Sequence, residues 1–364
     1  MLSSNKYDYL IVGAGFFGSV FAYEATKRNK KCLIIEKRNH IGGNAYTENI
    51  DGINVHKYGP HIFNTNNKPI WDYINNFAEF NPIVYKPKVS YKDKIYSFPI
   101  NLLTLHQLWG IKTPEEAIKK LNEVKLNIPE PKNLEEWALS QVGEEIYNIF
   151  IYGYTKKQWR KDPKDLPAFI IKRLPIRLTY DDNYYFSKYQ GIPIGGYTQI
   201  FDKLLEGIDV QLNTEFDKFN WTNYADKLVY TGKIDEFYDY RFGDLEYLTL
   251  RFENKTLDIP DFQGSAVINY TEESIPFTRI TEHKHFEGTN SSKTIISYEY
   301  SDTWNRSKVP FYPINTKQNQ DILLKYQFIE SNVIFGGRLA NYQYLNMDQI
   351  VAQALNAIKK EFNS

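Results

Sequence analysis

The feature that most constrains the fold is a short apolar run that leads into three glycines near the start of the chain. Residues 9–18 read YLIVGAGFFG, so Gly13, Gly15 and Gly18 stand at GxGxxG spacing. Between a strand and a helix, the first glycine permits a tight turn and the second lets the backbone approach a pyrophosphate. The third lets the helix pack close to the strand. This order predicts a dinucleotide-binding unit, with a purely structural turn as the alternative.

A second apolar run supports that interpretation. Residues 32–35 read CLII and are followed by Glu36, at roughly the twenty-residue distance from the glycines that such units show. A carboxylate at the end of this second strand is placed to accept a hydrogen bond from a ribose hydroxyl. Gly42 and Gly43 form a further glycine turn just after it, which favours FAD over NAD as the cofactor.

The composition limits the number of domains and the classes of partner. The chain has 364 residues, too many for one ordinary core, so two or three domains are expected. Lysine plus arginine and aspartate plus glutamate number 44 each. A net charge of zero argues against nucleic acid or an anionic membrane as an obligatory partner.

Cysteine usage and hydropathy indicate the compartment. Cys32 is the single cysteine, so no intramolecular disulfide is expected, and a reducing environment is predicted. The first eight residues lack the apolar core of a secretory signal. The uncharged run over residues 9–23 is shorter than the roughly 20 residues needed to span a bilayer. The sequence therefore predicts a soluble, cytoplasmic protein with no membrane span.

Periodicity predicts helices and strands along the rest of the chain. Helices are expected over residues 69–77, 102–154 (with starts at Thr113 and Asn133 and a break at Gly143), 198–205 and 347–362, and a hairpin over 83–98. Short apolar runs between residues 210 and 300, for example 227–230, 248–252 and 294–297, predict an antiparallel sheet. Residues 332–335 predict a buried strand, and residues 161–167 a mobile surface loop.

These patterns predict an α/β fold with a Rossmann-like FAD-binding domain, an inserted helical domain and an antiparallel β-sheet domain. The FAD-binding domain is expected to be discontinuous, over residues 1–80, 186–240 and 315–364. The helical domain, which would carry substrate-binding and lid residues, is expected over 100–170. The sheet domain is expected over 81–99, 171–185 and 241–314.

Tyrosine and arginine, rather than metal ligands or nucleophiles, mark the candidate substrate site. His283 and His285 stand two apart with no acid or cysteine at ligand spacing, so no metal site is predicted. No G-x-S-x-G elbow is present for hydrolysis. Tyrosine is combined with lysine over residues 150–159, and with arginine over 171–185 and in a third group formed by Arg251, Arg279 and 310–313. Guanidinium forks and tyrosine hydroxyls fit a diphosphate pocket; the alternative is that the aromatic residues fill cores and the arginines face solvent.

The chain resembles the UDP-galactopyranose mutases, a bacterial flavoenzyme family, from the glycine turn to the closing helix. The motifs that carry the resemblance are YGPHIF at 58–63, GYTKKQW at 153–159, TYDDNY at 179–184, KYQGIP at 188–193, YTGKIDEF at 230–237, DYRFG at 239–243, EHKHF at 282–286 and GRL at 337–339. The resemblance implies a non-redox mutase that interconverts UDP-galactopyranose and UDP-galactofuranose through an adduct between the sugar and N5 of reduced FAD.

The resemblance also implies roles for individual residues. Arg173 and Arg279 would clamp the diphosphate, His61 would lie beside the flavin ring, and residues 161–167 would close as a lid. The residues expected to bind substrate are Phe150, Tyr154, Trp159, Tyr184, Arg251, Tyr312, Tyr344 and Asn346. The residues expected to bind FAD are Gly13, Gly15, Phe16, Gly18, Glu36, Lys37, Gly43, Asn44, His61, Arg338 and Met347.

Four positions depart from the family pattern and leave the sugar open. Asn346 stands where aspartate is usual, and Ile151 where a second phenylalanine is usual. Leu248 replaces an arginine, and Arg160 replaces a glycine. The missing acid at position 346 leaves UDP-N-acetylgalactosamine, thymidine-linked fucose and UDP-arabinose as alternative substrates.

Two other classes of protein remain as alternatives, an amine-oxidase-like flavin oxidoreductase and an FAD-stabilised binding protein without activity. The expected partners are the nucleotide sugar, a system that reduces the flavin (NAD(P)H or a reductase), and further copies of the chain in a homodimer or higher homo-oligomer.

Overall fold

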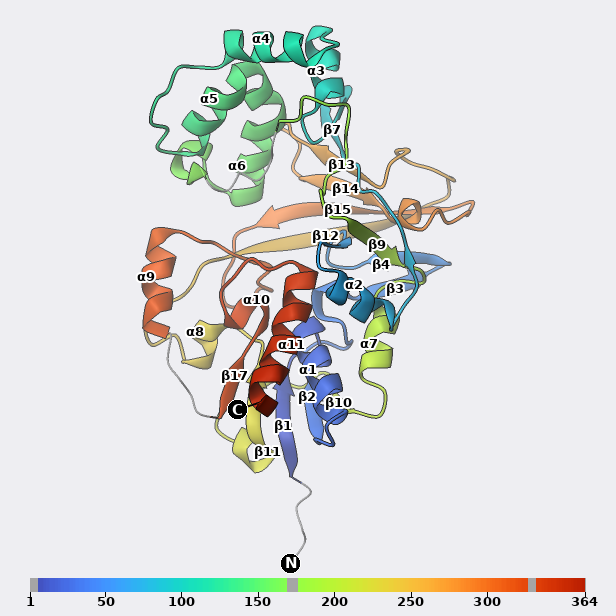
Figure 1. Cartoon of the computed structure of the whole chain (residues 1–364), viewed down its shortest axis with the longest axis vertical. Helices are drawn as coiled ribbons and strands as arrows, with labels where there is room; N and C mark the ends of the chain where they lie inside the picture. The colour runs from blue at the N-terminus through green and yellow to red at the C-terminus, as the bar shows by residue number, and fades with distance from the viewer. Residues whose placement is uncertain (1–5, 169–175, 327–331, 364) are drawn as a thin grey trace, which may run out of the picture.

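The computed structural model describes residues 6–168, 176–326 and 332–363. Its elements form three layers along the long axis of the molecule (Figure 1). A parallel sheet with its helices lies at the end that carries the N-terminus, a seven-stranded sheet crosses the middle, and a helical block stands at the far end.

The first layer is built on a five-stranded parallel sheet with the strand order β10-β2-β1-β11-β17. The strands are β1 (Tyr7–Val12), β2 (Cys32–Ile35), β10 (Asp209–Gln211), β11 (Ala225–Tyr230) and β17 (Val333–Phe335). Ile11 packs with α1 (Phe16–Thr26) and α11 (Met347–Asn363), while Leu10 packs on the other face with α8 (Ile234–Phe237) and α9 (Lys317–Tyr326). Burial on both faces explains why β1 and β2 read as continuous apolar runs.

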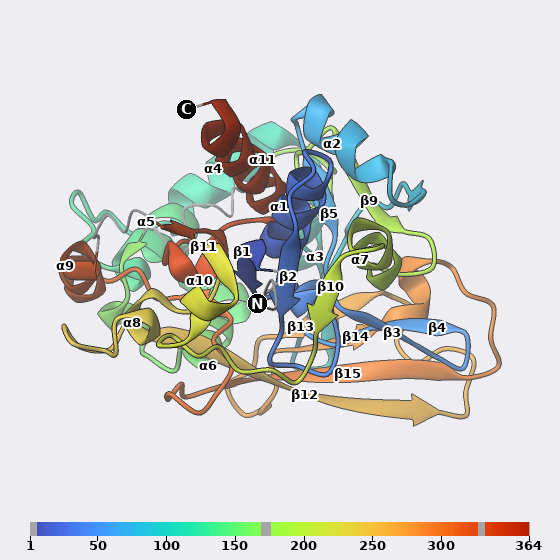
Figure 2. The same ribbon diagram turned by 90° about the horizontal axis from the view of Figure 1, so that it is seen from below.

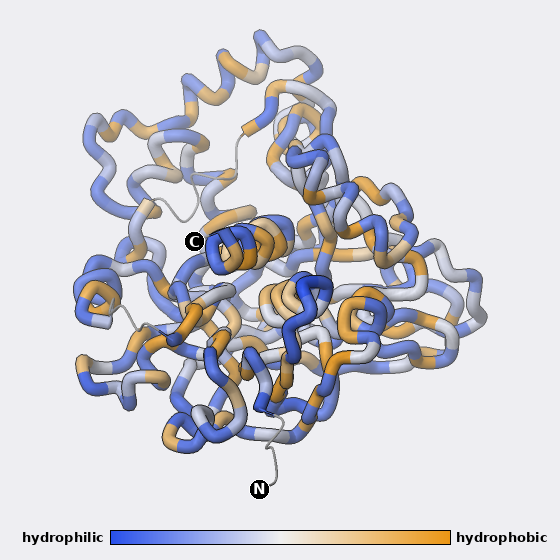
Figure 3. The backbone as a smooth tube through the Cα atoms, turned by 60° about the horizontal axis from the view of Figure 1, so that its bottom comes forward, coloured by the Kyte–Doolittle hydropathy of each residue, from blue (hydrophilic) through white to orange (hydrophobic). Residues whose placement is uncertain are grey.

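The closing helix α11 is buried on one face. Val351, Ala354 and Ile358 are buried and recur at helical spacing. Along this helix, which ends at the C-terminus, Figure 3 shows hydrophobic and hydrophilic residues alternating. The prediction of a helix over 347–362 is confirmed.

The middle layer is a seven-stranded sheet with the order β16-β12-β15-β14-β13-β7-β8. Its strands are β7 (Lys88–Tyr91), β8 (Lys94–Ser97), β12 (Tyr247–Leu257), β13 (Val267–Tyr270), β14 (Arg279–Glu282), β15 (Thr294–Asp302) and β16 (Tyr312–Pro313). Neighbouring strands are antiparallel except β13 and β7. Seen from below, β12 and β15 run along one side of the molecule, opposite α1, α2 (Lys68–Asn75) and α11 (Figure 2).

The helical block contains α3 (Leu102–Trp109), α4 (Pro114–Val124), α5 (Leu134–Ile146) and α6 (Gly153–Trp159), with a π-helical turn over Tyr147–Tyr152 between the last two. The predicted starts are confirmed, because Thr113 Oγ1 accepts from the backbone N–H of Glu116 and Asn133 Oδ1 accepts from that of Glu136. Gly143 has φ +74° and interrupts α5, as its position in the sequence predicts.

The remaining elements connect these layers. They are β3 (Thr47–Ile50), β4 (Ile53–His56), β5 (Phe63–Thr65), β6 (Phe80–Asn81), β9 (Tyr189–Pro193), α7 (Thr198–Leu204) and α10 (Gly337–Ala340), with short 3-10 turns over Gly43–Ala45, Pro163–Asp165, Trp221–Asn223 and His283–Phe286. Among the described residues, no helix combines the length and the apolar character needed to cross a membrane.

The predicted fold class is confirmed, and one strand assignment is wrong. Residues 227–230 lie in β11, which pairs in parallel with β1 and β17 rather than in the antiparallel sheet. A short apolar run looks the same whichever partner it has, so its pattern could not identify the sheet. The domain limits stay a prediction.

Candidate functional site

A cavity of about 590 Å³ opens at the carboxyl ends of β1, β2 and β11, the edge at which sheets of this kind bind ligands. Every residue predicted to bind FAD lines this cavity. Further lining residues come from 214–219, 231–233 and 309–311, which were not assigned to the cofactor. Of these, the motif at 230–237 and the run 310–313 stood out in the sequence, but nothing local showed which ligand they meet.

The three glycines of the first turn serve two different purposes. Gly13 has φ +103°, and a Cβ there would lie 2.2 Å from Thr231 Oγ1. A Cβ on Gly18 would lie 2.1 Å from the Gly13 carbonyl oxygen, so both glycines are required by the fold itself. Gly15 has an ordinary φ of −83°, and the nearest atom to a Cβ there is Gly43 Cα at 3.9 Å. Gly15 therefore leaves open space in the cavity, as close approach of a pyrophosphate needs.

The polar groups of the cavity fit a dinucleotide. No side chain caps α1 at Gly15, so the N–H groups of its first turn are available to an anion. Arg338 donates from Nη1 to Phe311 O and from Nη2 to Leu345 O, and its buried Nε has no hydrogen-bond partner among the described residues. Glu36 accepts from the backbone N–H of Ala14 at 3.0 Å and adds a carboxylate for a ribose. The cavity thus offers donors for a pyrophosphate and an acceptor for a sugar hydroxyl, so the residues present fit FAD.

His61 lies in the cavity as a neutral imidazole. Burial lowers the pKa of His61 to about 4. Its Nδ1 lies 2.7 Å from the Gly59 carbonyl oxygen, and because a carbonyl can only accept, the ring proton is on Nδ1. Nε2 is then the acceptor of this side chain.

A ladder of buried histidines holds His61 in place. The backbone N–H of His61 donates to His56 Nδ1 at 3.1 Å, and that of His56 donates to His283 Nδ1 at 3.3 Å. His283 Nε2 lies 2.6 Å from Ser297 Oγ on β15. Burial lowers the pKa of His283 to about 3 and that of His56 well below its usual value. The histidine of the 282–286 motif thus connects the cavity to the seven-stranded sheet.

A second group of side chains adjoins the cavity, and we call it the tyrosine–arginine cluster. Its members are Arg279, Glu299, Tyr85, Tyr154, Tyr184, Tyr185, Tyr312 and Tyr344. They come from β14, β15, α6, β16 and connecting segments, so residues far apart in the sequence meet here.

Arg279 is the centre of this cluster. Its Nη2 donates to Tyr154 Oη at 2.6 Å, and its Nε lies 3.1 Å from Glu299 Oε1. Neither contact uses Nη1. The Arg279 side chain is 22% exposed and that of Glu299 only 4%. Burial alone would lower the pKa of Arg279, but the Glu299 carboxylate, together with the hydroxyl groups of Tyr154, Tyr85 and Tyr312, raises it well above its usual value.

The tyrosines of the cluster contact one another through their rings. Tyr312 and Tyr344 stack with centroids 5.0 Å apart, and Tyr184 meets Tyr85 edge-on at 5.4 Å and Tyr185 at 5.0 Å. Burial raises the pKa of Tyr154 to about 12, so its hydroxyl stays protonated. The cluster therefore combines one cation with hydroxyl groups and aromatic faces.

The cavity and the cluster share a border. The Arg338 guanidinium, which lines the cavity, lies 5.1 Å from the Tyr312 ring centroid and 5.4 Å from that of Tyr344. On the other side, a Cβ on Gly59 would lie 3.4 Å from Glu299 Oε2, so the turn that presents His61 touches the ion pair of Arg279.

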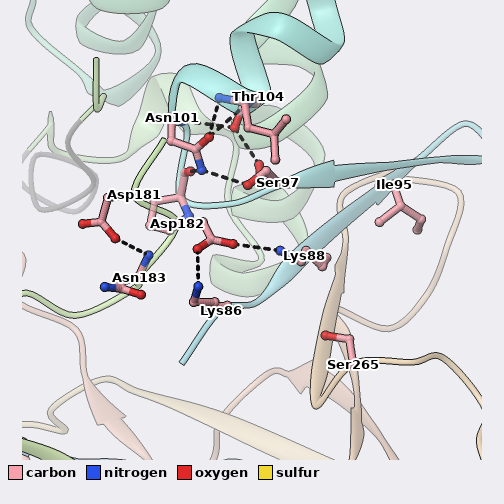
Figure 4. A network of polar contacts seen from close by, with 12 residues as sticks. Lys86, Lys88, Ile95, Ser97, Asn101, Thr104, Asp181, Asp182, Asn183 and Ser265 are labelled. Atoms are coloured by element: carbon pink, nitrogen blue, oxygen red, sulfur yellow. Dashed lines mark hydrogen bonds and ion pairs between the residues drawn. The ribbon is translucent and has the colours of Figure 1, made fainter. Parts of the chain in front are cut away.

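The segment that carries Tyr184 and Tyr185 is held by ion pairs of Asp182 and by a hydrogen bond from the buried Arg177. Asp182 Oδ1 lies 2.9 Å from Lys86 Nζ, and Oδ2 lies 3.1 Å from Lys88 Nζ (Figure 4). Burial would raise the pKa of Asp182, but the two lysines lower it below its usual value. Arg177, with a side chain 5% exposed, donates to the backbone oxygen of Asn183. These contacts set the position of the two tyrosines.

Phe150 borders the cluster from the helical block. Phe150 is buried, and its ring is nearly parallel to that of Phe98, with centroids 6.4 Å apart. Phe98 in turn lies 6.2 Å from the Tyr184 ring. Trp159 ends α6 and packs at the edge of the same core. Arg173 lies outside the described residues.

The structure does not bring Arg251 to the cluster. Arg251 on β12 is paired with Tyr300 on β15. The residue beside Tyr300 on the same strand, Glu299, is paired with Arg279 on β14. Because successive side chains of a strand point to opposite faces, Arg251 lies on the other face of the sheet from Arg279. There it pairs with Glu253 and is half exposed. Its contact with substrate stays a prediction.

Several functional candidates were missed by the sequence reasoning. Glu299 and Tyr85 belong to the cluster but were not singled out, and Tyr185 was noted only as part of the segment 171–185. Alternation along 294–302 indicates a strand, yet only the register with β14 places Glu299 opposite Arg279. Asn346, which was predicted near the sugar, is exposed at the start of α11, two residues after Tyr344.

Three departures from the family pattern and the predicted lid have clear positions. Arg160 ends α6 with φ +53°, a conformation that favours glycine. Ile151 and Leu248 are both buried in cores. Leu166 is 2% exposed and its carbonyl accepts from the Leu134 N–H, so the predicted surface loop 161–167 is anchored to α5 at this point. Closure over a substrate stays a prediction.

Folding brings two acids to His285 that sequence spacing did not reveal. Ligand atoms of Asp261, Glu282 and His285 lie within 4.8 Å of one another. Glu282 already accepts from two backbone N–H groups and from Thr294 Oγ1. The oxygen lone pairs of Glu282 are therefore largely engaged. Its carboxylate links the end of β14 to the loop that contains Phe262 and Gln263.

Comparison with known proteins agrees with this architecture. A family model described as UDP-galactopyranose mutase matches residues 149–344, and one described as an NAD(P)-binding Rossmann-like domain matches residues 11–77. The chain is 42% identical to an Escherichia coli dTDP-fucopyranose mutase, over 95% of this chain and 96% of that protein. It is 41% identical to a Klebsiella pneumoniae protein named "Probable UDP-galactopyranose mutase", over 99% and 96%. A crystal structure of reduced UDP-galactopyranose mutase superposes with a TM-score of 0.76 at 15% identity, covering 98% of this chain and 96% of that one, which supports the fold.

Proposed function

The chain belongs to the UDP-galactopyranose mutase family of isomerases, and from this premise we propose that it interconverts UDP-galactopyranose and UDP-galactofuranose with a bound, reduced FAD. The observation that carries the proposal is the tyrosine–arginine cluster at the border of the cavity. There a largely buried guanidinium donates to Tyr154 from Nη2 and forms an ion pair with Glu299 on its Nε side, which leaves Nη1 for an anionic ligand.

The diphosphate of the substrate binds to Arg279 in this proposal, with hydroxyl groups of Tyr184, Tyr312 and Tyr344 as further donors. Negative charge grows on the diphosphate as its bond to the anomeric carbon breaks. Donors fixed in advance therefore stabilise the transition state more than the bound substrate. Glu299 contributes by keeping the guanidinium oriented. Arg173 joins this clamp on the family resemblance alone.

When bound, reduced FAD would supply a nucleophilic ring nitrogen, N5, for attack on the anomeric carbon. His61, with its proton on Nδ1, adds no charge beside the cofactor and offers Nε2 as an acceptor. Phe150 and Tyr154 hold the nucleobase, and Trp159 borders the sugar. A reductase or NAD(P)H is needed to prime the flavin but is not consumed at each turnover.

A second candidate is the same reaction on thymidine-linked fucose. The observations that favour it are the 42% identity to a dTDP-fucopyranose mutase and the amide of Asn346 in place of a carboxylate. A 6-deoxy sugar lacks one hydroxyl group of galactose and so has less need of a charged acceptor.

A direct comparison of the two furanose substrates tests the proposal. The dithionite-reduced protein is incubated without oxygen with UDP-galactofuranose or dTDP-fucofuranose, and pyranose formation is followed by chromatography. We expect kcat/KM to be at least tenfold higher for the UDP sugar, whereas the reverse ratio would establish the second candidate. Turnover of neither sugar would contradict the proposed reaction. Asn346→Asp is the matched variant, and it should raise kcat/KM for the galactose pair relative to the fucose pair.

A further inference from the structure

Lys157 is a buried lysine whose ammonium group is bound by backbone carbonyls. Its Nζ donates to Tyr270 O at 2.6 Å, Phe277 O at 2.9 Å and Ile275 O at 3.0 Å. The residue is 8% exposed. Three carbonyl acceptors match the three N–H donors of a charged lysine, so only the ammonium form satisfies all of them. The function proposed above makes no use of this group.

All three carbonyls belong to the segment that leads from the end of β13 into Arg279. Tyr270 ends β13, Arg279 begins β14, and the turn between them contains Ile275 and Phe277. The helix α6, which carries Lys157, lies directly against this turn, because a Cβ on Gly153 would be 2.2 Å from Thr271 O. Helix and turn are thus packed at the closest distance that a glycine allows.

The same helix also holds the guanidinium at the other end of the Arg279 side chain. Tyr154, one turn before Lys157 on α6, accepts a hydrogen bond from Arg279 Nη2 at 2.6 Å. Lys157 fixes the backbone that precedes Arg279, and Tyr154 fixes its tip. The position of the cluster's central cation therefore depends on how α6 sits on the β13–β14 turn.

We propose that Lys157 is a positioning residue for Arg279, which sets the place of the guanidinium and thereby the affinity of the site for the diphosphate of a nucleotide substrate. The inference rests on the proposed function, since it concerns the same site. Lys157 itself does not touch Arg279; its contacts reach Arg279 through the turn.

The environment of Lys157 is consistent with a role that needs an ammonium group. Burial lowers the pKa of Lys157 to about 8, while the carboxylate of Glu272 acts to raise it. Burial of an uncharged residue of the same length would cost less desolvation free energy, but it would leave three buried carbonyl oxygens without hydrogen-bond donors.

A double-mutant cycle separates positioning from a purely structural role. The dissociation constants of UDP and dTDP, which carry the diphosphate without a sugar, are measured calorimetrically on the flavin-loaded protein. Lys157→Met is introduced into the unchanged protein and into Arg279→Ala. We expect at least tenfold weaker binding in the first background and less than twofold in the second, because a residue that acts through Arg279 has nothing left to position. Flavin content and the melting temperature are recorded for each variant.

Lys156 provides the matched control. It is the adjacent lysine and contacts the same turn, but through a partly exposed ion pair with Glu273 at 2.7 Å. Lys156→Met should change nucleotide affinity less than twofold. If Lys157→Met does not fold, Lys157→Gln, whose amide keeps N–H donors, takes its place in the cycle.

The outcomes distinguish the inference from the function on which it rests. Equal losses in both backgrounds, or unchanged affinity in Lys157→Met, would overturn the positioning role while leaving the proposed function in place. If the unchanged protein bound neither UDP nor dTDP, the proposed function itself would be contradicted, and the inference with it.

Discussion

The dinucleotide cavity and the tyrosine–arginine cluster share a border but are built in opposite ways. The cavity is lined by several glycine-containing turns, which leave room for a ligand and expose backbone N–H groups to it. The cluster is assembled from side chains of strands and helices far apart in the sequence, and it offers a cation, hydroxyl groups and rings. The contrast teaches that binding of the cofactor and binding of the substrate should be separable by substitution.

Replacing Arg279 is the strongest test of that separation. Arg279→Ala should lower turnover by a factor on the order of 10³, because it removes a donor aimed at the charge that develops on the diphosphate. The flavin should remain bound, since Arg279 does not line the cavity. Absorbance spectra and initial rates measure the two effects. Arg306→Ala, at a surface arginine paired with Asp244, is the control and should leave both unchanged. Loss of flavin from Arg279→Ala would mean that the two regions are not separable.

Two glycines test the cavity side of the comparison. Gly15→Ala should fold normally, because its Cβ meets no atom closer than 3.9 Å, but should weaken flavin binding at least tenfold by occupying space beside the pyrophosphate. Gly18→Ala should instead lower the melting temperature of the protein without flavin, since its Cβ would lie 2.1 Å from a backbone oxygen. Flavin titration and thermal unfolding distinguish the two. Equal melting temperatures for both variants would contradict this division of roles.

The histidine ladder that connects the cavity to the seven-stranded sheet predicts a pH dependence of stability. His56, His61 and His283 have pKa values below the ordinary value of 6.5 in the folded chain, so the unfolded chain binds protons that the folded chain does not. Stability is therefore complete above about pH 6.5 and falls as pH decreases, by about 1.4 kcal/mol per histidine for each pH unit. Urea unfolding at pH 7, 6 and 5 measures the slope. His283→Gln should reduce it, and an unchanged slope would contradict the assignment of that ring as neutral.

The smallest expected effect concerns the end of α6. Arg160→Gly should stabilise the protein by up to about 1 kcal/mol, because Arg160 adopts a left-handed conformation that costs an ordinary residue about that amount. Nucleotide affinity should be unaffected, since the change lies beyond Tyr154 and Lys157. Chemical unfolding measures the effect, and a loss of stability would indicate that the Arg160 side chain makes a favourable surface interaction.

The two regions also differ in how far the sequence predicts them. Gly13, Gly18 and Glu36 are tied to one local unit, so spacing alone placed them correctly around the cavity. Glu299 reaches Arg279 only through strand register, and the same register separates Arg251 from the cluster. Residues 227–230 pair with β1 and β17 in the parallel sheet. The sequence did not reveal this pairing, because both partners lie more than a hundred residues away along the chain. Local patterns carry no information on such pairings.

The most direct test of the account is a count of turnovers for each electron pair. The flavin-loaded protein is reduced with one equivalent of dithionite under argon and given an excess of UDP-galactofuranose, while the flavin spectrum and the products are followed together. The account predicts many ring interconversions for each flavin, with the spectrum of the reduced cofactor restored at the end. One product for each electron pair consumed would contradict it, because the cluster and the cavity would then serve a redox reaction.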